Sequence, residues 1–239
     1  METTLHRQLK EHYCSEGCEI EVKFGRYRID VVDGDRLIEI QHSGLASIRS
    51  KIQNLTQSHK VDVVKPIVAR KRLVKLSRKG GKVVSERMSP KRGGFLDLID
   101  ELMYFTRVFP HTNLRMIVPK VEVTEFRYPG HGRRRRKRAG DFVVQDRVME
   151  RLIESTIYVK AQDLHQELPP TLAETFDTQE LAAKMEIARW QAQRVAYVLK
   201  HTGSIKQVGK QGNSLLYKKV RPRRVKKKSK SVRGKATAA

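Results

Sequence analysis

Apolar and polar positions alternate with a period of two between residues 18 and 43. Residues 18–24 are therefore predicted to form a strand, because successive side chains of a strand point to opposite faces. Two further alternating runs flank Asp33-Gly34-Asp35. Asp-Gly between such runs is a strong signal for a tight turn. Residues 26–43 are thus predicted to form a β-hairpin, around which the rest of the chain is organised.

The rest of the N-terminal half combines helical and strand periodicity. Residues 3–13 place Leu5 and Leu9 at helical spacing, and Ser43 precedes an apolar helical stripe as a candidate N-cap. The predicted helices are residues 3–13, 45–58 and 95–109, and the further predicted strands are residues 61–69, 82–85, 113–119 and 121–126. Pro66 lies inside one of these strands and predicts an edge or a bend there. Helices alternating with strands indicate an α/β domain with a mixed sheet.

A second pattern begins after residue 140. Apolar spacing predicts helices over residues 142–153, 159–168, 176–185 and 188–201, followed by a hairpin of residues 205–208 and 214–217. The last of these helices ends before Gly203, a typical C-terminal stop. The order helix, turn, helix, hairpin resembles a winged helix-turn-helix domain over residues 141–220.

That resemblance implies a mode of DNA binding. The second of the paired helices would enter the major groove, and the hairpin would touch the DNA backbone. The residues placed on DNA in this way are Arg189, Gln191, Gln193, Arg194, Lys206, Lys210 and Lys218. A winged domain used for protein contact is the alternative.

The net charge of the chain is +24, from 50 Lys and Arg against 26 Asp and Glu, and the pI is about 10.3. Such an excess favours a polyanion as partner, and nucleic acid before an anionic membrane. No apolar run approaches the roughly 18 to 20 residues of a membrane span, and the N-terminus has no signal-peptide pattern. We therefore expect a cytoplasmic, nucleoid-associated protein that binds DNA, with RNA as the alternative.

Two short segments carry much of this charge. Residues 129–140 contribute +6 and residues 221–239 contribute +9. Both segments lack apolar periodicity, and their like-charged side chains repel one another. The first is therefore predicted to be a linker and the second a disordered tail. Their candidate phosphate-binding residues are Arg133, Arg134, Arg135, Arg136, Lys137 and Arg138, and Lys226, Lys227 and Lys228. Solvated charge that keeps the protein in solution is the alternative.

Two carboxylates, Asp30 and Glu39, lie inside the apolar strands of the predicted hairpin. A buried, unpaired carboxylate is costly, so each is expected to have a partner. A divalent cation suits two acids at once, because Mg²⁺ and Mn²⁺ prefer hard oxygen ligands. The alternative is a hairpin whose acids form ion pairs with nearby arginines, namely Arg26, Arg28 or Arg36.

The hairpin resembles the PD-(D/E)XK nuclease superfamily, in which an acid on one strand is followed by acid-x-polar on its neighbour. The resemblance is closest to the branch of the competence protein CoiA, through Arg28-Ile29-Asp30-Val31 and Ile38-Glu39-Ile40-Gln41-His42-Ser43. It covers about the first half of the chain. Gln41 departs from the superfamily pattern, because most members carry lysine at that position.

The resemblance implies roles for several residues. Asp30, Glu39 and the carbonyl of Ile40 would hold Mg²⁺ or Mn²⁺, with Glu11 as the acid that the first helix often adds. Gln41 would orient a water molecule.

Lys51, on the following helix, would replace the missing lysine. The alternatives are that Glu11 is an ordinary surface residue and that Lys51 is an exposed helix charge.

The resemblance also implies a fold. We expect an α/β restriction-endonuclease-like mixed sheet flanked by helices at residues 1–128, then the linker, the winged-helix domain and the tail. The expected function is that of a metal-dependent DNA endonuclease or DNA-processing nuclease that hydrolyses phosphodiester bonds. The alternatives are a nuclease-fold protein that binds DNA without cutting it, and a winged-helix regulator.

Cys14 and Cys18 are the only cysteines. With His6 and His12 they would supply four zinc ligands, but no second pair follows at finger spacing. We therefore expect two reduced thiols near a helix end, with zinc as the alternative.

Overall fold

The computed structural model describes residues 2–130 and 141–221. The helices are α1 (Thr4–His12), η1 (Leu45–Ile48), α2 (Arg49–Leu55), α3 (Phe95–Leu102), η2 (Ala161–Glu167), α4 (Thr178–Met185) and α5 (Arg189–His201), where η denotes 3₁₀ helices. The strands are β1 (Glu19–Phe24), β2 (Tyr27–Asp33), β3 (Arg36–Ile40), β4 (Lys60–Val64), β5 (Ile67–Leu76), β6 (Val83–Met88), β7 (Leu114–Pro129), β8 (Phe142–Tyr158), β9 (Thr175–Phe176), β10 (Ile205–Gln211) and β11 (Ser214–Lys219). They form a mixed α/β structure, in which an eight-stranded sheet with helices precedes a small three-stranded antiparallel sheet with two α-helices.

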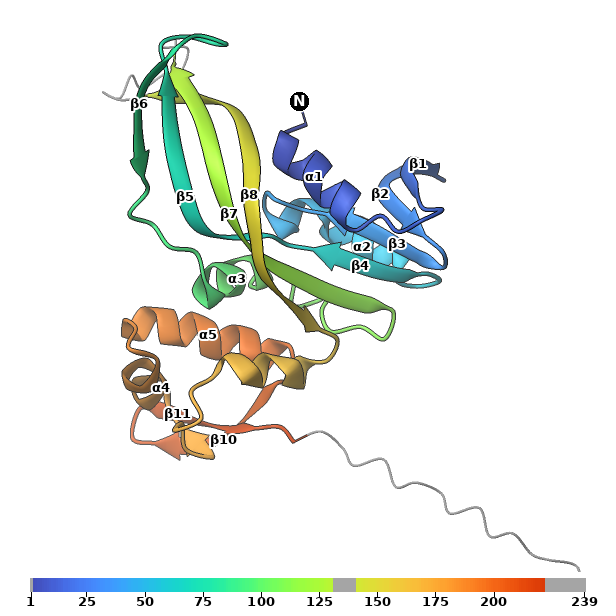
Figure 1. Cartoon of the computed structure of the whole chain (residues 1–239). Coiled ribbons are helices and arrows are strands. Elements are labelled where there is room, and N and C mark those ends of the chain that lie inside the picture. The colour runs from blue at the N-terminus through green and yellow to red at the C-terminus, as the bar shows by residue number, and fades with distance from the viewer. Residues whose placement is uncertain (1, 131–140, 222–239) are drawn as a thin grey trace, which may run out of the picture.

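The predicted hairpin is present as β2 and β3 (Figure 1). Asp33 pairs with Arg36, so the turn between them has two residues. Gly34 in this turn has a φ of 56°, a left-handed conformation that glycine adopts without steric cost. The hairpin joins the large sheet through β3, which pairs parallel with β4.

Strand β7 lies at the centre of the large sheet, whose order is β1-β2-β3-β4-β7-β5-β6, with β8 also paired to β7. Both β4 and β5 run parallel to β7, beside its first and second halves respectively. Lys65 and Pro66 connect the end of β4 to the start of β5. Proline has no N–H to donate, and the strand predicted over residues 61–69 is interrupted here, as the proline signal indicates.

The interruption divides the sheet into two regions. Strand β3 flanks β4, whereas β6 flanks β5. In Figure 1, β5, β6, β7 and β8 rise together beyond the region that holds the hairpin. We call this raised part, residues 67–88, 120–130 and 141–154, the β-lobe.

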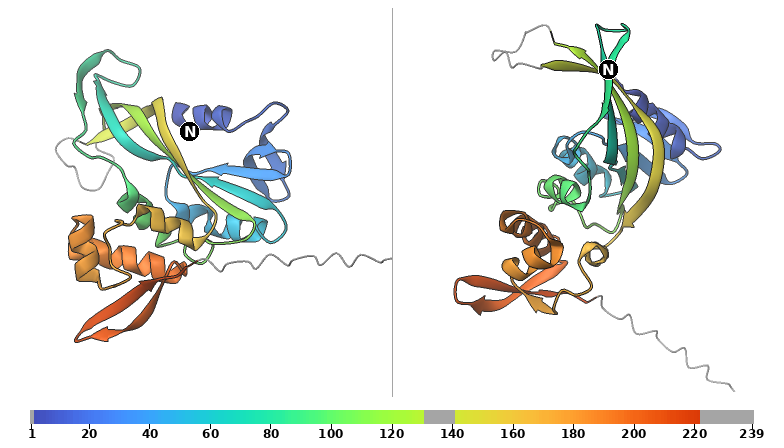
Figure 2. Two further views of the ribbon diagram at one scale, coloured as in Figure 1. Left: turned by 60° about the horizontal axis from the view of Figure 1, so that its bottom comes forward. Right: turned by 60° about the vertical axis from the view of Figure 1, so that its left-hand side comes forward.

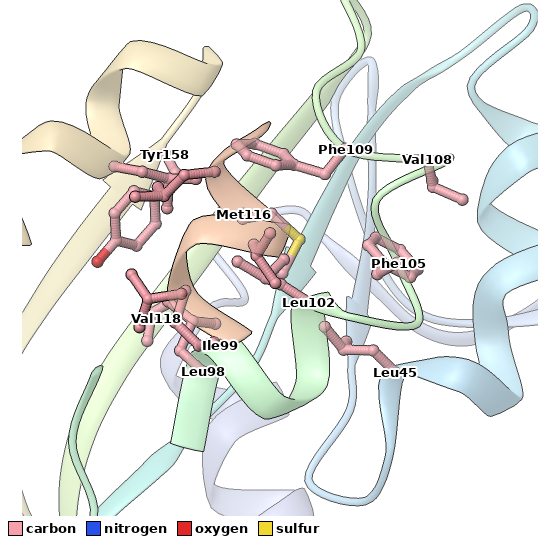
Figure 3. Close-up of a cluster of buried hydrophobic side chains, with 14 of the residues drawn as sticks. Leu45, Leu98, Ile99, Leu102, Phe105, Val108, Phe109, Met116, Val118 and Tyr158 are labelled. Atoms are coloured by element: carbon pink, nitrogen blue, oxygen red, sulfur yellow. The ribbon is translucent and has the colours of Figure 1, made fainter. Parts of the chain in front are cut away.

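Helices cover both faces of the sheet. Leu5 and Leu9 of α1 pack with Val31, Ile38 and Val121 on one face. On the other face, side chains of α2 and α3 pack against alternate positions of β3, β4 and β7. Figure 3 shows Leu98, Ile99 and Leu102 of α3 against Met116 and Val118 of β7.

The small C-terminal unit packs against α3 (Figure 2). Ala192 and Val195 of α5 belong to the same buried cluster as α3. Arg194 of α5 also forms an ion pair with Asp100 of α3, at 2.7 Å. The small sheet has the order β10-β11-β9. Among residues 2–130 and 141–221, no helix combines the length and apolar character that crossing a bilayer requires.

The helix predicted over residues 142–153 is wrong, because this segment is part of strand β8. It pairs antiparallel with β7 along the length of both strands. The segment is rich in β-branched residues, such as Val143, Val144 and Val148, which fit a pleated surface. Residues 142–158 therefore belong to the large sheet and not to the small unit in which the sequence pattern places them.

Other boundaries differ from the predictions in smaller ways. The helix predicted over 95–109 ends at Leu102, and the two strands predicted over 113–119 and 121–126 form one strand, β7. Residues 161–167 form a 3₁₀ helix, and the helix predicted over 45–58 is divided into η1 and α2, ending at Leu55. Ser43 is not the N-cap. That position belongs to Gly44, which has no side chain to accept a hydrogen bond.

Asp62 provides a test of this architecture. Its carboxylate is almost fully buried on β4 and forms ion pairs with Arg36 of β3 and Arg115 of β7. Removing it leaves two partly buried guanidinium groups without their partner, so we expect Asp62→Ala to lower the free energy of unfolding by about 2–4 kcal/mol in urea denaturation. Asp35→Ala removes an exposed ion pair with Lys60 and is the matched control. Equal losses in both variants would contradict this assignment.

Candidate active site at the central hairpin

Asp30 lies where the β2–β3 pairing stops. The last paired residues are Val31 and Ile38. Beyond them, the N–H of Ile40 donates to Asp30 Oδ2 at 2.8 Å. The carboxylate thus takes the place of a backbone carbonyl, which ties the Asp30 side chain to the end of the ladder.

Helix α1 brings His6 to the same carboxylate. His6 Nε2 lies 3.3 Å from Asp30 Oδ2, and its Nδ1 lies 3.0 Å from Glu2 Oε1. Burial acts to raise the pKa of Asp30, but the hydrogen bonds from His6 and from the N–H of Ile40 outweigh it, and the pKa is lowered. The hydrogen bond to Asp30 raises the pKa of His6 against the opposing effect of burial. Asp30 is therefore held in its charged form.

Glu39 is the second carboxylate of the site, on β3. Its side chain is 11% exposed, and its Oε2 accepts a hydrogen bond from Lys51 Nζ at 2.5 Å. The same ammonium group donates to the carbonyl of Arg28 at 2.5 Å. Burial and the charge of Asp30 raise the pKa of Glu39, and Lys51 offsets only part of this effect. The two acids and the lysine therefore form one electrostatic group.

Gln41 points toward the loop that leads to Lys51. Its Nε2 donates to the carbonyl of Gly44 at 2.8 Å and to Ser47 Oγ at 2.5 Å. Through these bonds, Gln41 fixes the turn between β3 and η1. Its amide N–H groups are thus engaged with the loop and not with Asp30 or Glu39.

Lys65 holds the same loop from the sheet. This buried side chain donates to the carbonyl of Ser43 and to Glu101 Oε1, the latter at 3.0 Å. Glu101 Oε2 in turn accepts the N–H of Leu45 at 2.7 Å. Burial lowers the pKa of Lys65, while Glu101 partly offsets the effect. The start of η1 is therefore anchored by a buried charged pair at the β4–β5 interruption.

The structure brings together five of the residues predicted for the site, namely Asp30, Glu39, Ile40, Gln41 and Lys51. Glu11 is not with them. It is exposed and lies 4.0 Å from Arg7 of its own helix. His6, which the sequence pattern does not assign to this site, contacts Asp30 instead, and Glu2 contacts the other ring nitrogen of His6. The signal for His6 was its place beside Leu5 on the buried face of α1.

The arginines of the alternative interpretation have other partners. Arg28 pairs with Glu21, Arg36 pairs with Asp62, and the guanidinium of Arg26 lies 5.0 Å from the centre of the Tyr27 ring. The hairpin acids are instead paired with His6 and Lys51.

The donor set agrees with a hard divalent cation. Across residues 2–130 and 141–221, no group of three or more His, Cys, Asp and Glu side chains is arranged to hold a metal ion. Asp30, Glu39 and the carbonyl of Ile40 nevertheless supply oxygen ligands of the type that Mg²⁺ prefers. Mg²⁺ is commonly held by one or two carboxylates, with water and substrate phosphates completing its coordination. Two adjacent acids therefore fit this mode of binding.

Cys14 and Cys18 form a disulfide, which corrects the expectation of two reduced thiols. The chain turns back after α1, where Gly17 has a φ of 83°, and the two Cα atoms lie 5.6 Å apart. That separation is within the range of a disulfide. The bonded sulfurs also exclude the zinc site of the alternative interpretation.

The residues predicted to contact DNA are only partly free. Arg189 and Gln193 are exposed on α5, and Lys206 and Lys210 are exposed on β10. Gln191 caps the helix by accepting the N–H of Ala188 at 3.0 Å. Arg194, besides its ion pair with α3, lies 4.9 Å from the centre of the Trp190 ring. Lys218 pairs with Glu174 at 3.2 Å. Arg133–Arg138 and Lys226–Lys228 lie outside the described residues, as do most of the predicted linker and tail.

The fold and the site define a mixed α/β protein whose central hairpin carries two acids beside a lysine. Residues 3–159 match a domain of unknown function (DUF8091), and the chain belongs to that family. An uncharacterized protein of Treponema pallidum (strain Nichols) is 33% identical over 116 residues, which are 48% of this chain and 46% of the relative. The chain thus spans about half the length of this curated relative. No solved structure matches the chain significantly.

The contact between His6 and Asp30 gives stability a pH dependence. The pKa of His6 is raised in the folded state, so the pair contributes fully below about pH 6.5, the ordinary value for histidine. This contribution is lost as the pH rises through the raised pKa. We therefore expect wild type to exceed His6→Gln in unfolding free energy at pH 5.5, with a smaller difference at pH 8.5. His59→Gln is the control, because the His59 imidazole contacts the Ser58 hydroxyl. If the stability difference from wild type decreases equally between pH 5.5 and pH 8.5 for His6→Gln and for His59→Gln, the assignment is contradicted.

Proposed function

We propose that this protein is a metal-dependent DNA endonuclease or DNA-processing nuclease. The observation that carries the proposal is the contact of Lys51 with Glu39, next to Asp30. Two acids and a lysine are the groups that the PD-(D/E)XK resemblance requires. Here the lysine comes from a helix instead of the strand, where Gln41 stands.

Asp30, Glu39 and the carbonyl of Ile40 would hold Mg²⁺ or Mn²⁺. When bound, such an ion lowers the pKa of a water molecule and neutralises charge on the scissile phosphate. Asp30 is suited to this role because its pKa is lowered, so that it stays charged as an ion ligand.

Lys51 would supply the positive charge at the reacting phosphate. Its ammonium group is 16% exposed and is already oriented by Glu39 and the carbonyl of Arg28. A preoriented cation stabilises charge that develops in the transition state without reorganising at that moment. We assign Gln41 to positioning the loop that carries Lys51, in place of the water-orienting role that the resemblance implies.

The small unit supports a second part of the proposal, DNA binding through a winged helix. Its elements follow the order η2, β9, α4, α5, β10, β11, with the paired helices before the hairpin. The exposed face of α5 carries Arg189 and Gln193, and its last turn carries Lys200. Such side chains can contact base edges and phosphates. These features, with the net charge, favour DNA as the partner.

A nuclease-fold protein that binds DNA without cutting it is the second candidate. The observation that favours it is Gln41, because this residue replaces the strand lysine and is engaged with the loop.

Supercoiled plasmid provides the test. With Mg²⁺ or Mn²⁺ we expect the purified full-length protein to nick or linearise the plasmid, and EDTA to stop it. Asp30→Ala and Glu39→Ala should abolish cutting, and Lys51→Ala should slow it by about 100-fold or more, since a stabilising donor at a reacting centre contributes about that much. Arg49→Ala is the matched control, because it removes an exposed charge from the same helix.

Metal binding is measured separately by calorimetry with Mn²⁺. Binding in wild type that is lost in both acid variants would place the ion at the hairpin. DNA binding without cutting under either metal would overturn the enzyme and leave the second candidate.

The winged unit is tested with a DNA duplex in EDTA. We expect Arg189→Ala combined with Gln193→Ala to weaken duplex binding by about tenfold, as the loss of one good base contact would. Fluorescence anisotropy measures the affinity. Lys184→Ala, an exposed position on α4, is the control. Unchanged affinity in the double variant would exclude α5 as the DNA-reading helix.

A further inference from the structure

The face of the sheet that holds α1 continues onto the β-lobe. Helix α1 reaches Asp30 through His6 and also contacts β8, where the N–H of Thr4 donates to Asp146 at 2.8 Å. Val121 and Val123 of β7 pack on this face. Because side chains of a strand alternate, Glu125 and Arg127 extend the same face toward the tip of the lobe. The α1 face and the lobe tip therefore lie on one side of the sheet, whereas Glu39 contacts Lys51 of α2 on the other side.

On this face of the β-lobe, the charged side chains around Glu125 are paired, whereas positive charge is in excess at the tip. The buried carboxylate of Glu125 is neutralised by Lys71 at 3.1 Å and by Arg147 at 3.0 Å. Further toward the tip come three cations from three adjacent strands, Lys75, Arg87 and Arg127. Within the described residues, none of these three forms an ion pair. The tip thus carries three cationic side chains that no ion pair within the described residues neutralises.

A pocket of about 580 Å³ lies among these cations. Its remaining lining comes from Tyr128, Pro129, Asp141 and Phe142, at the ends of β7 and β8. The Phe142 ring is 41% exposed, and the guanidinium of Arg127 lies 4.5 Å from its centre. A pocket of this volume has the size of a typical small-ligand site. Aromatic and cationic side chains therefore meet in a space that one nucleotide would fill.

We propose that this pocket binds an unpaired nucleotide of a nucleic-acid strand. The base would stack on Phe142 and the Arg127 guanidinium, and Lys75 and Arg87 would contact the phosphates on either side. The inference rests on the proposed function, because it adds a second contact for the nucleic-acid substrate, at the tip of the β-lobe. The pocket would thus recognise two chemical parts of the ligand, the flat ring of the base and the anionic phosphate backbone.

A single strand suits the pocket better than a duplex. A duplex presents phosphates on its outside and keeps its bases stacked on one another, so it would engage the cations but not the Phe142 ring. An unpaired base exposes its flat face, and stacking on an aromatic side chain is tolerant of sequence. Phe142 therefore distinguishes the two forms of nucleic acid.

The experiment compares a labelled single-stranded oligonucleotide with a duplex of the same length, bound to the full-length protein in EDTA so that no cutting occurs. We expect Phe142→Ala to weaken single-strand binding by about tenfold, in the range of base–aromatic stacking, and to leave duplex binding unchanged. Phe142→Trp should restore the affinity. A triple variant, with Lys75, Arg87 and Arg127 changed to Ala, should lower the magnitude of the slope of log affinity against log salt concentration by about 1.4 for the single strand, because two of the three cations would contact phosphates.

The matched control removes three exposed charges elsewhere, through Lys23→Ala, Arg107→Ala and Lys160→Ala. Two outcomes would overturn the proposal for this pocket. One is an equal loss of single-strand affinity in the two triple variants, and the other is an equal effect of Phe142→Ala on single-strand and duplex affinity. Plasmid cleavage is scored independently, because Phe142 lies outside the hairpin site. If the protein does not cut plasmid but Phe142→Ala still weakens only single-strand binding, the proposed nuclease activity is wrong and the pocket is a single-strand binding site.

Discussion

The structure depends on the continuous pairing of β7. On one edge this strand pairs with β8, and on the other with β4 and then β5. That continuity spans the interruption at Pro66, which removes one backbone donor from the adjacent strand. At the same place the N–H of Lys65 bonds to the carbonyl of Ile117, and the N–H of Gln41 bonds to that of Val64. The sheet therefore stays intact where β3 ends and its chain turns toward η1, and the candidate site occupies that junction.

Charge balance then sets the character of the junction. The three acids Asp30, Glu39 and Glu101 each have a basic partner from another element, namely His6, Lys51 and Lys65. Breaking a buried pair leaves an uncompensated charge, so such pairs fix the relative positions of the elements that carry them. Helices α1, α2 and α3 are thus located relative to the hairpin by ionic contacts as well as by their apolar faces. The contrast between Asp30 and Glu39 follows from the same balance, because only Asp30 receives both a backbone N–H and an imidazole.

Local signals are enough for the hairpin, but not for the long strands, and Lys51 is indicated only by the family resemblance. Asp33-Gly34-Asp35 and the flanking alternation determine β2 and β3 through contacts close in sequence. Strand β8 is different, because its apolar spacing also fits a helix and its conformation is decided by pairing with β7. The approach of His6 to Asp30 likewise depends on how α1 crosses the sheet. The sequence carries these long-range choices only weakly. Glu11 is instead what the family resemblance indicates, because an acid on the first helix often joins the metal ligands there.

The exchange of Gln41 and Lys51 changes how relatives of this protein can be recognised. A search pattern that requires lysine two residues after the second acid would reject this chain, although a lysine ammonium group contacts that acid in space. The informative signature is therefore a spacing of twelve residues between Glu39 and Lys51, across a strand end, a turn and the first turn of a helix. Selection on such a pair acts on the length of the intervening loop as much as on the two residues. Insertions or deletions between residues 40 and 50 are accordingly expected to break the contact between Lys51 and Glu39.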